Sequence, residues 1–183
     1  MAVEKPLKDL KERTRELLIW LSGFAVFTLI IPGAIIITLP ADQRPDGLAV
    51  LAAVPILEYL AVSIGIGLDI HPITSFFLTI LPCIGSCMLV IGLIGFLGDS
   101  SVRATRFLEK VQKRIEKYPR LQKYGVVSNF IFVMILGMYI TPGVAIVLGW
   151  SRFRSILFMA AGISFITILI GLGTLGIINL FFV

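Results

Sequence analysis

One carboxylic acid lies deep within an apolar segment of this sequence. Glu58 stands near the middle of residues 48–68, which otherwise hold only apolar and small or weakly polar side chains. Placing a carboxylate at the centre of a bilayer costs about 3 kcal/mol or more. The group is therefore expected to be protonated or to face a water-filled cavity, and either state suits a proton carrier or a polar substrate contact. The alternative is a neutral Glu58 that bonds only to nearby backbone.

Further polar and backbone-breaking residues accompany Glu58 in the same segment and in a second one, residues 126–150. We expect them to form a site that binds a substrate or a proton. The predicted site comprises Glu58, Tyr59, Ser63, Thr141, Pro142 and Gly143, with Pro55 and Gly137 breaking the two segments.

The other reactive side chains do not form a catalytic or metal-binding set. Cys83 and Cys87 are one helical turn apart, but no second Cys or His pair completes a zinc site, so a packing role is expected. His71 is the single histidine, and a solvated turn explains it better than a pH switch. No nucleophile has a neighbouring base, and no phosphate-binding glycine loop is present. The sequence predicts neither an enzyme nor a cofactor.

The elements that hold these residues are membrane segments. Apolar residues make up 57% of the chain and charged residues 15%, too apolar for a soluble domain of this length. Four stretches reach the roughly 20 apolar residues of a transmembrane helix: 17–39, 48–68, 73–97 and 126–183, the last divided at Trp150–Arg154. Pro32-Gly33 is expected to bend the first, and 40–47 to form a loop. The sequence predicts a single all-α membrane domain over residues 1–183.

The positions of the basic residues restrict how the segments cross. Cytoplasmic loops carry the excess of Lys and Arg. If every segment crosses, neither orientation gives a clear excess on one side. If 48–68 and 126–150 both turn back, 15 of the 16 bases lie inside and Arg44 alone lies outside. Letting 126–150 cross still leaves 13 inside and 3 outside. The charges also exclude nucleic acid as a partner, because they flank apolar segments where anionic head groups lie.

We therefore predict about three full spans and two opposed re-entrant hairpins, arranged as an inverted repeat. The units are an N-terminal helix and span (1–39), a hairpin and span (48–97), and a second hairpin and span (126–183). Each limb of the first hairpin has about 10 residues, or ~15 Å, half of a ~30 Å hydrocarbon core. Such repeats form substrate sites at the midplane. The competing prediction is that 73–97, with Pro82 and Gly85, re-enters instead.

Residues 99–124 form a different kind of element. Apolar side chains recur at helical spacing and Pro119 follows them, which indicates an amphipathic helix on the membrane surface. A partner-binding helix is the alternative. Its opposite face is basic, with Arg103, Arg106, Lys110, Lys113, Arg114 and Lys117.

Several short motifs resemble a known family. Residues 55–65, followed by His71-Pro72, are similar to a Glu-Leu-Arg-Gly-Ala-Ile-Pro stretch of the small multidrug export proteins. Tyr139–Gly143 is similar to the second half of that family. More distantly, Pro142-Gly-Val144 with Ser151–Phe153 and Gly162 resembles the DedA (VTT-domain) superfamily. That resemblance implies two opposed hairpins and movement of polyprenyl-phosphate or phospholipid head groups. The arginines expected by the two patterns are Leu60 and Ala145 here, so no arginine clamp for phosphate is present at either position.

These observations predict a membrane transporter or flippase for an amphipathic or lipidic molecule, with proton coupling through Glu58 and drug export as the family name suggests. The alternative is a non-catalytic membrane scaffold that binds partners through the basic helix. We expect membrane lipids as partners, a homodimer, and a multi-pass protein of the plasma membrane with a cytoplasmic N-terminus.

Overall fold

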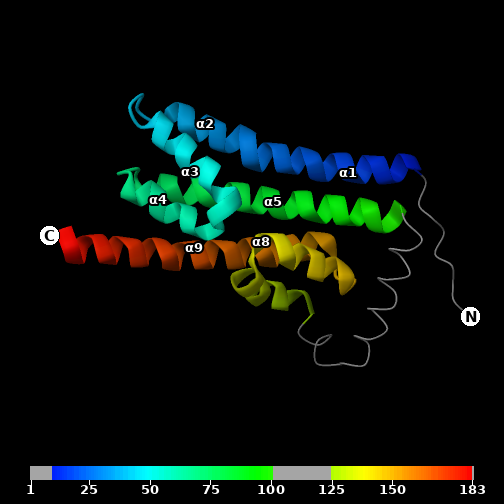
Figure 1. Cartoon of the computed structure of the whole chain (residues 1–183). Helices are drawn as coiled ribbons and strands as arrows, with labels where there is room; N and C mark the ends of the chain where they lie inside the picture. Colours follow the sequence, from blue (N-terminus) through cyan, green and yellow to red (C-terminus); the bar gives the residue numbers. More distant parts are fainter. Residues whose placement is uncertain (1–9, 101–124, 183) are drawn as a thin grey trace, which may run out of the picture.

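The protein is helical throughout the part of the chain that its computed structural model describes, residues 10–100 and 125–182 (Figure 1). Within these described residues, five helical segments are long and apolar enough to cross a membrane. The first runs from α1 (Leu10–Ala25) through a π-helical turn (Val26–Ile30) into α2 (Ile31–Thr38). The π turn ends two residues before Pro32, whose ring lacks the N–H of a regular helical turn, so the helix is irregular just before the predicted bend.

The second apolar segment is a helical hairpin, here called hairpin 1. It consists of α3 (Arg44–Leu57), a 3₁₀ turn (Glu58–Leu60) and α4 (Ala61–Gly67). The backbone leaves the helical region at Glu58, with φ 50° and ψ −119°. A Cβ atom on Gly65 would lie 3.1 Å from Val50 Cγ2. In a straight helix these residues would be about 22 Å apart, so the chain has turned back on itself.

The fourth apolar segment also reverses and is called hairpin 2. A 3₁₀ turn (Gly125–Val127) leads into α8 (Ser128–Val147), which is interrupted at Gly137, with φ 82° and ψ 173°. The rings of Phe132 and Trp150 stack with centroids 6.4 Å apart. A straight helix would separate them by about 27 Å, so this segment turns back as well. Each reversal lies where the sequence predicted it.

Two long helices, α5 (Pro72–Ser100) and α9 (Arg152–Phe182), follow the hairpins and run antiparallel to each other (Figure 1). The side chain of Arg152, at the start of α9, lies against Gly95, near the end of α5. Helix α5 continues without a break through Pro82. The competing prediction that residues 73–97 re-enter is therefore wrong. Helix α5 packs against α1, α3, α4, α8 and α9 and forms the centre of the molecule.

The two hairpin–helix units repeat in detail at an offset of 80 residues. Hairpin 1 ends with the Ile70 N–H bonded to the Gly65 carbonyl at 3.0 Å, and Asp69 has φ 58°. Hairpin 2 ends with the Trp150 N–H bonded to the Ala145 carbonyl at 3.0 Å, and Gly149 has φ 68°. Both turns are Schellman C-caps. The offset supports an internal repeat whose two halves run in opposite directions.

One prediction from the sequence is wrong in its bounds, and another concerns residues that the structure does not describe. The loop predicted at 40–47 is shorter, because Pro45 in the first turn allows α3 to begin at Arg44. The Arg44 guanidinium bonds to the Ile37 and Leu39 carbonyls and so caps the end of α2. Most of the predicted surface helix, including all six of its basic site residues, lies outside the described residues.

Candidate functional site

The tips of the two hairpins meet beside the middle of α5. The Cys87 thiol donates a 3.4 Å hydrogen bond to the Met138 carbonyl, just after the break of hairpin 2. Cys87 lies about 22 Å along α5 from Pro72. That distance places the meeting point, here called the hairpin crossing, about halfway along a helix long enough to span a bilayer.

Glu58 joins the two hairpins. Its Oε2 atom accepts a hydrogen bond from the Met138 N–H at 3.2 Å. Met138 begins the second limb of hairpin 2, where the first N–H groups of a helix lack helical partners. A Cβ atom on Gly137 would lie 2.8 Å from both carboxyl oxygens, so only glycine leaves room for the Glu58 side chain. The backbone of Gly137 also has a conformation essentially restricted to glycine.

Two tyrosines make reciprocal bonds across the crossing. The buried Tyr59 hydroxyl, from hairpin 1, donates to the Val133 carbonyl of hairpin 2. The Tyr139 hydroxyl, from hairpin 2, donates to the Pro55 carbonyl of hairpin 1 at 2.9 Å. Each carbonyl belongs to the last helical turn before a break, where such groups need outside donors. The tyrosines are 80 residues apart and are therefore equivalent in the repeat.

Pro142 explains why Cys87 bonds to the crossing. A proline has no N–H, so in the second limb of hairpin 2 the carbonyl four residues earlier, that of Met138, has no helical donor. The Cys87 thiol supplies one. Cys83 and Cys87 are both fully buried, as their expected packing role requires, and Cys87 has this additional polar contact.

The remaining predicted site residues do not contact Glu58 directly. The Ser63 hydroxyl pairs with Thr174 of α9 at 2.7 Å, so it points away from the crossing. Thr141 donates to the Gly137 carbonyl at 2.9 Å and supports the break. Gly143 faces α5, where Ile94 Cδ1 is the nearest atom to a Cβ placed on it. The geometry therefore brings together Glu58, Tyr59, Pro55 and Gly137 from the predicted set.

Four residues at the crossing were not predicted as part of the site: Val133, Met138, Tyr139 and Cys87. Val133 and Met138 contribute backbone groups, which no side-chain pattern reveals. Tyr139 was identifiable, because it repeats Tyr59 at the offset that also relates Ser75 to Ser155.

The crossing combines one ionisable group with hydrogen bonds that fix two opposed hairpins. The carboxyl group has two oxygens and several lone pairs, and the Met138 N–H uses one of them. Glu58 itself is half-buried, while its neighbours Leu57 and Tyr139 are exposed, so the crossing borders the surface of the chain. The remaining acceptor positions can therefore bind a proton, water or the polar part of a ligand.

Comparison with known proteins identifies a family for this chain. Residues 59–170, more than half of the chain, match the family described as "Putative small multi-drug export protein". The chain belongs to this family. The family match begins at Tyr59 and covers α5, hairpin 2 and most of α9. The family name indicates a general transport role, and the DedA resemblance stays a prediction. No curated protein and no solved structure matches the chain.

Proposed function

We propose that this small multidrug export family member moves an amphipathic or lipidic molecule across the membrane at the hairpin crossing, with Glu58 as its proton-responsive group. The observation that carries the proposal is the Glu58–Met138 hydrogen bond, which links two hairpins that enter from opposite ends of the helix bundle. In an inverted repeat, the substrate site lies between the halves near the midplane. We accordingly propose that both hairpins are re-entrant.

A change in the charge of Glu58 alters the strength of this link. A carboxylate accepts a backbone hydrogen bond more strongly than a neutral carboxyl group. Protonation of Glu58 therefore weakens the contact with Met138 and allows the hairpins to separate. Deprotonation restores the contact and closes the crossing. In this mechanism a proton and a substrate compete for the same acceptor oxygens.

The test is transport by purified protein in liposomes, using ethidium as a cationic drug probe and a fluorescent phospholipid as a lipid probe. Glu58→Gln keeps the size of the side chain and one acceptor oxygen but removes the titration. We expect it to abolish transport of the probe that the unmodified protein moves and to leave the folded protein intact by size-exclusion chromatography and thermal unfolding.

The matched control is Glu12→Gln, the same chemical change at an exposed position of α1. It should leave transport unchanged. Full transport by a well-folded Glu58→Gln protein would remove Glu58 from the mechanism. The scaffold alternative makes the opposite prediction, because there charge reversal at Lys113, Arg114 and Lys117 is the damaging change.

A further inference from the structure

An apolar groove lies on the flank of the molecule between α4, α5 and α9. Its volume is about 340 Å³, and its walls include Val62, Phe77 and Leu172. Thr167 is the polar residue in the groove, and its hydroxyl already donates to the Ile163 carbonyl at 2.7 Å. The groove therefore offers an occupant apolar contact and no free hydrogen-bonding side chain.

In the internal repeat, this groove is equivalent to a surface of α5 that helix α1 covers. The groove residues Pro72, Ile168 and Leu172 correspond, at the 80-residue offset, to Arg152, Met88 and Gly92. Met88 and Gly92 belong to the α1-binding face of α5, which is formed by Gly85, Met88 and Gly92. The groove is thus the counterpart, on α9, of the surface that α1 covers on α5.

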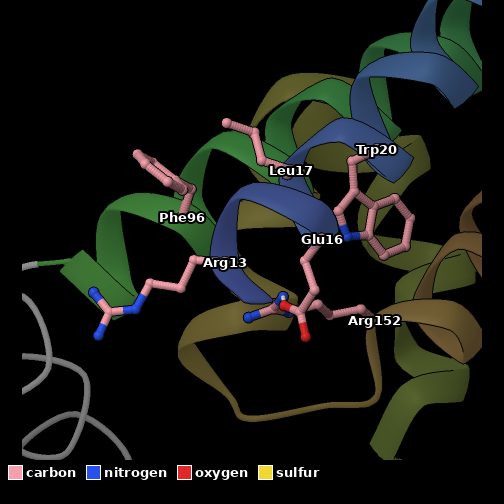
Figure 2. A pocket seen from close by; sticks show the side chains of 7 residues that line it. Arg13, Glu16, Leu17, Trp20, Phe96 and Arg152 are labelled. Atoms are coloured by element: carbon pink, nitrogen blue, oxygen red, sulfur yellow. Dashed lines mark hydrogen bonds and ion pairs between the residues drawn. The ribbon is translucent and has the colours of Figure 1, made fainter. Parts of the chain in front are cut away.

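Helix α1 packs directly on its side of the repeat (Figure 2). A Cβ atom on Gly92 would lie 2.6 Å from Trp20 Cβ, so the two helices are in direct contact. Glu16 pairs with Arg152 at 2.9 Å, and Figure 2 shows both beside Arg13 and Trp20. The space left among these side chains does not admit a water molecule.

A helix cannot occupy the groove in the same way. Close approach of α1 depends on glycines at 85 and 92, but α9 has Phe165 and Leu172 at the matching positions. These side chains are 45% and 62% exposed and would hold a helix backbone away. The counterpart of Arg152 is Pro72, so the charge that pairs with Glu16 of α1 is also missing. The occupant must be narrower than a helix and uncharged along its length.

We infer that the groove binds the hydrocarbon chain of a lipidic substrate, an alkyl or prenyl chain that lies along α9 between α4 and the start of α5. The inference rests on the proposed transport function and specifies its substrate class. The groove runs beside α4, the limb of hairpin 1 that follows Glu58, so a chain bound there lies along the hairpin that carries Glu58 to the crossing.

The experiment uses the full chain in nanodiscs that contain a phospholipid with a photoreactive diazirine in its acyl chain. After illumination, mass spectrometry locates the labelled residues. We expect Phe77 and Leu172 in the groove to be labelled more strongly than Leu169, which is 48% exposed on the same helix but outside the groove.

Two glycine variants of α9 provide the decisive comparison. A Cβ on Gly171 would meet Val62 and Ile66 at an unstrained 3.7 Å, so the helix accommodates a side chain here. Gly171 lines the groove, and Gly171→Leu places a larger apolar side chain in it. We expect it to reduce groove labelling by about tenfold, the effect of about 1.4 kcal/mol on binding. Gly173 has no heavy atom within 4 Å, and Gly173→Leu should leave the labelling unchanged.

Three results would overturn the inference. The first is equal labelling of the groove and Leu169, which would indicate ordinary contact with bulk lipid. The second is groove labelling that Gly171→Leu does not reduce. The third is groove labelling that disappears when each nanodisc holds two copies of the chain, which would indicate that a second copy occupies the groove. The labelling measures binding and does not require transport. Groove labelling by a protein that moves no probe would therefore contradict the proposed transport function and leave the lipid-binding role of the groove standing.

Discussion

At the residue scale, the hairpin crossing depends on a few positions that tolerate little change. Glu58 has positive φ although it is not glycine, and Gly137 has a backbone conformation that other residues avoid. The two meet directly, since the Glu58 carboxyl group occupies the space that a side chain at 137 would fill. A change at either position affects both hairpins.

Gly137→Ala tests this dependence. The variant should be less stable by about 2 kcal/mol or more, because the backbone is strained and the new methyl group displaces the Glu58 carboxyl. Thermal unfolding in detergent measures the difference. Gly173→Ala, at an open helical position, serves as the control and should be neutral or slightly stabilising. Equal unfolding temperatures for the two variants would contradict the role of Gly137.

The two tyrosines give a paired prediction. Tyr59→Phe and Tyr139→Phe each remove one hydrogen bond to a carbonyl of the opposite hairpin. Tyr59 is buried whereas Tyr139 is 41% exposed. Loss of the buried bond should cost about 1–2 kcal/mol, and loss of the exposed one about half as much or less, because other donors can reach the Pro55 carbonyl. Unfolding midpoints that reverse this order would contradict the arrangement at the crossing.

At the scale of elements, the positions of the basic residues predicted the two reversals, and local signals indicated where the chain breaks. Pro55 with Glu58, and Gly137 with Pro142, interrupt segments that are otherwise continuous and apolar. Pro82 is an equally visible signal, yet α5 continues through it. A proline alone does not determine whether a helix breaks, since neighbouring helices can donate a hydrogen bond to the carbonyl that the proline leaves free. The second limb of hairpin 2 illustrates this, because Cys87 bonds to the carbonyl that Pro142 leaves free.

The two equivalent turns after the hairpins can be tested by exchanging the residues at their positive-φ positions. Asp69 and Gly149 are equivalent and both have positive φ. Asp69→Gly should stabilise the protein by up to about 1 kcal/mol, because glycine adopts this conformation without steric cost. Gly149→Asp should destabilise it by a similar amount. The two unfolding midpoints, measured under the same conditions, should shift in opposite directions. Shifts of the same sign would show that the turns are not equivalent.

At the scale of the whole molecule, the sequence could not predict which parts meet. The Glu58–Met138 bond joins residues 80 positions apart, and the groove depends on how α9 lies against hairpin 1. Such contacts follow from the packing of the two halves rather than from the pattern within one segment. The basic residues did restrict the number of crossings, because each hairpin that turns back changes the side on which all later loops lie.

Labelling of engineered cysteines tests that topology directly. In a variant without Cys83 and Cys87, we expect Asp42→Cys and His71→Cys to react with a membrane-impermeant reagent from the same side, and Ser151→Cys from the other. All three positions are exposed. The distance along α5 from its start at Pro72 to Gly95, which contacts Arg152, is about 35 Å, enough to cross a bilayer. Opposite sides for positions 42 and 71 would contradict a re-entrant hairpin 1.

Helix α1 covers only one of the two repeats, so the two ends of the helix bundle differ. Helix α1 closes the flank near the start of α9, while no helix within residues 10–100 and 125–182 covers the equivalent flank near the start of α5. These flanks lie toward opposite ends of α5. Under the proposed lipid transport, a lipid in the leaflet beside the groove would meet an open entrance, and a lipid in the other leaflet would meet helix α1. We therefore propose that the two otherwise mirrored halves load lipid from one leaflet.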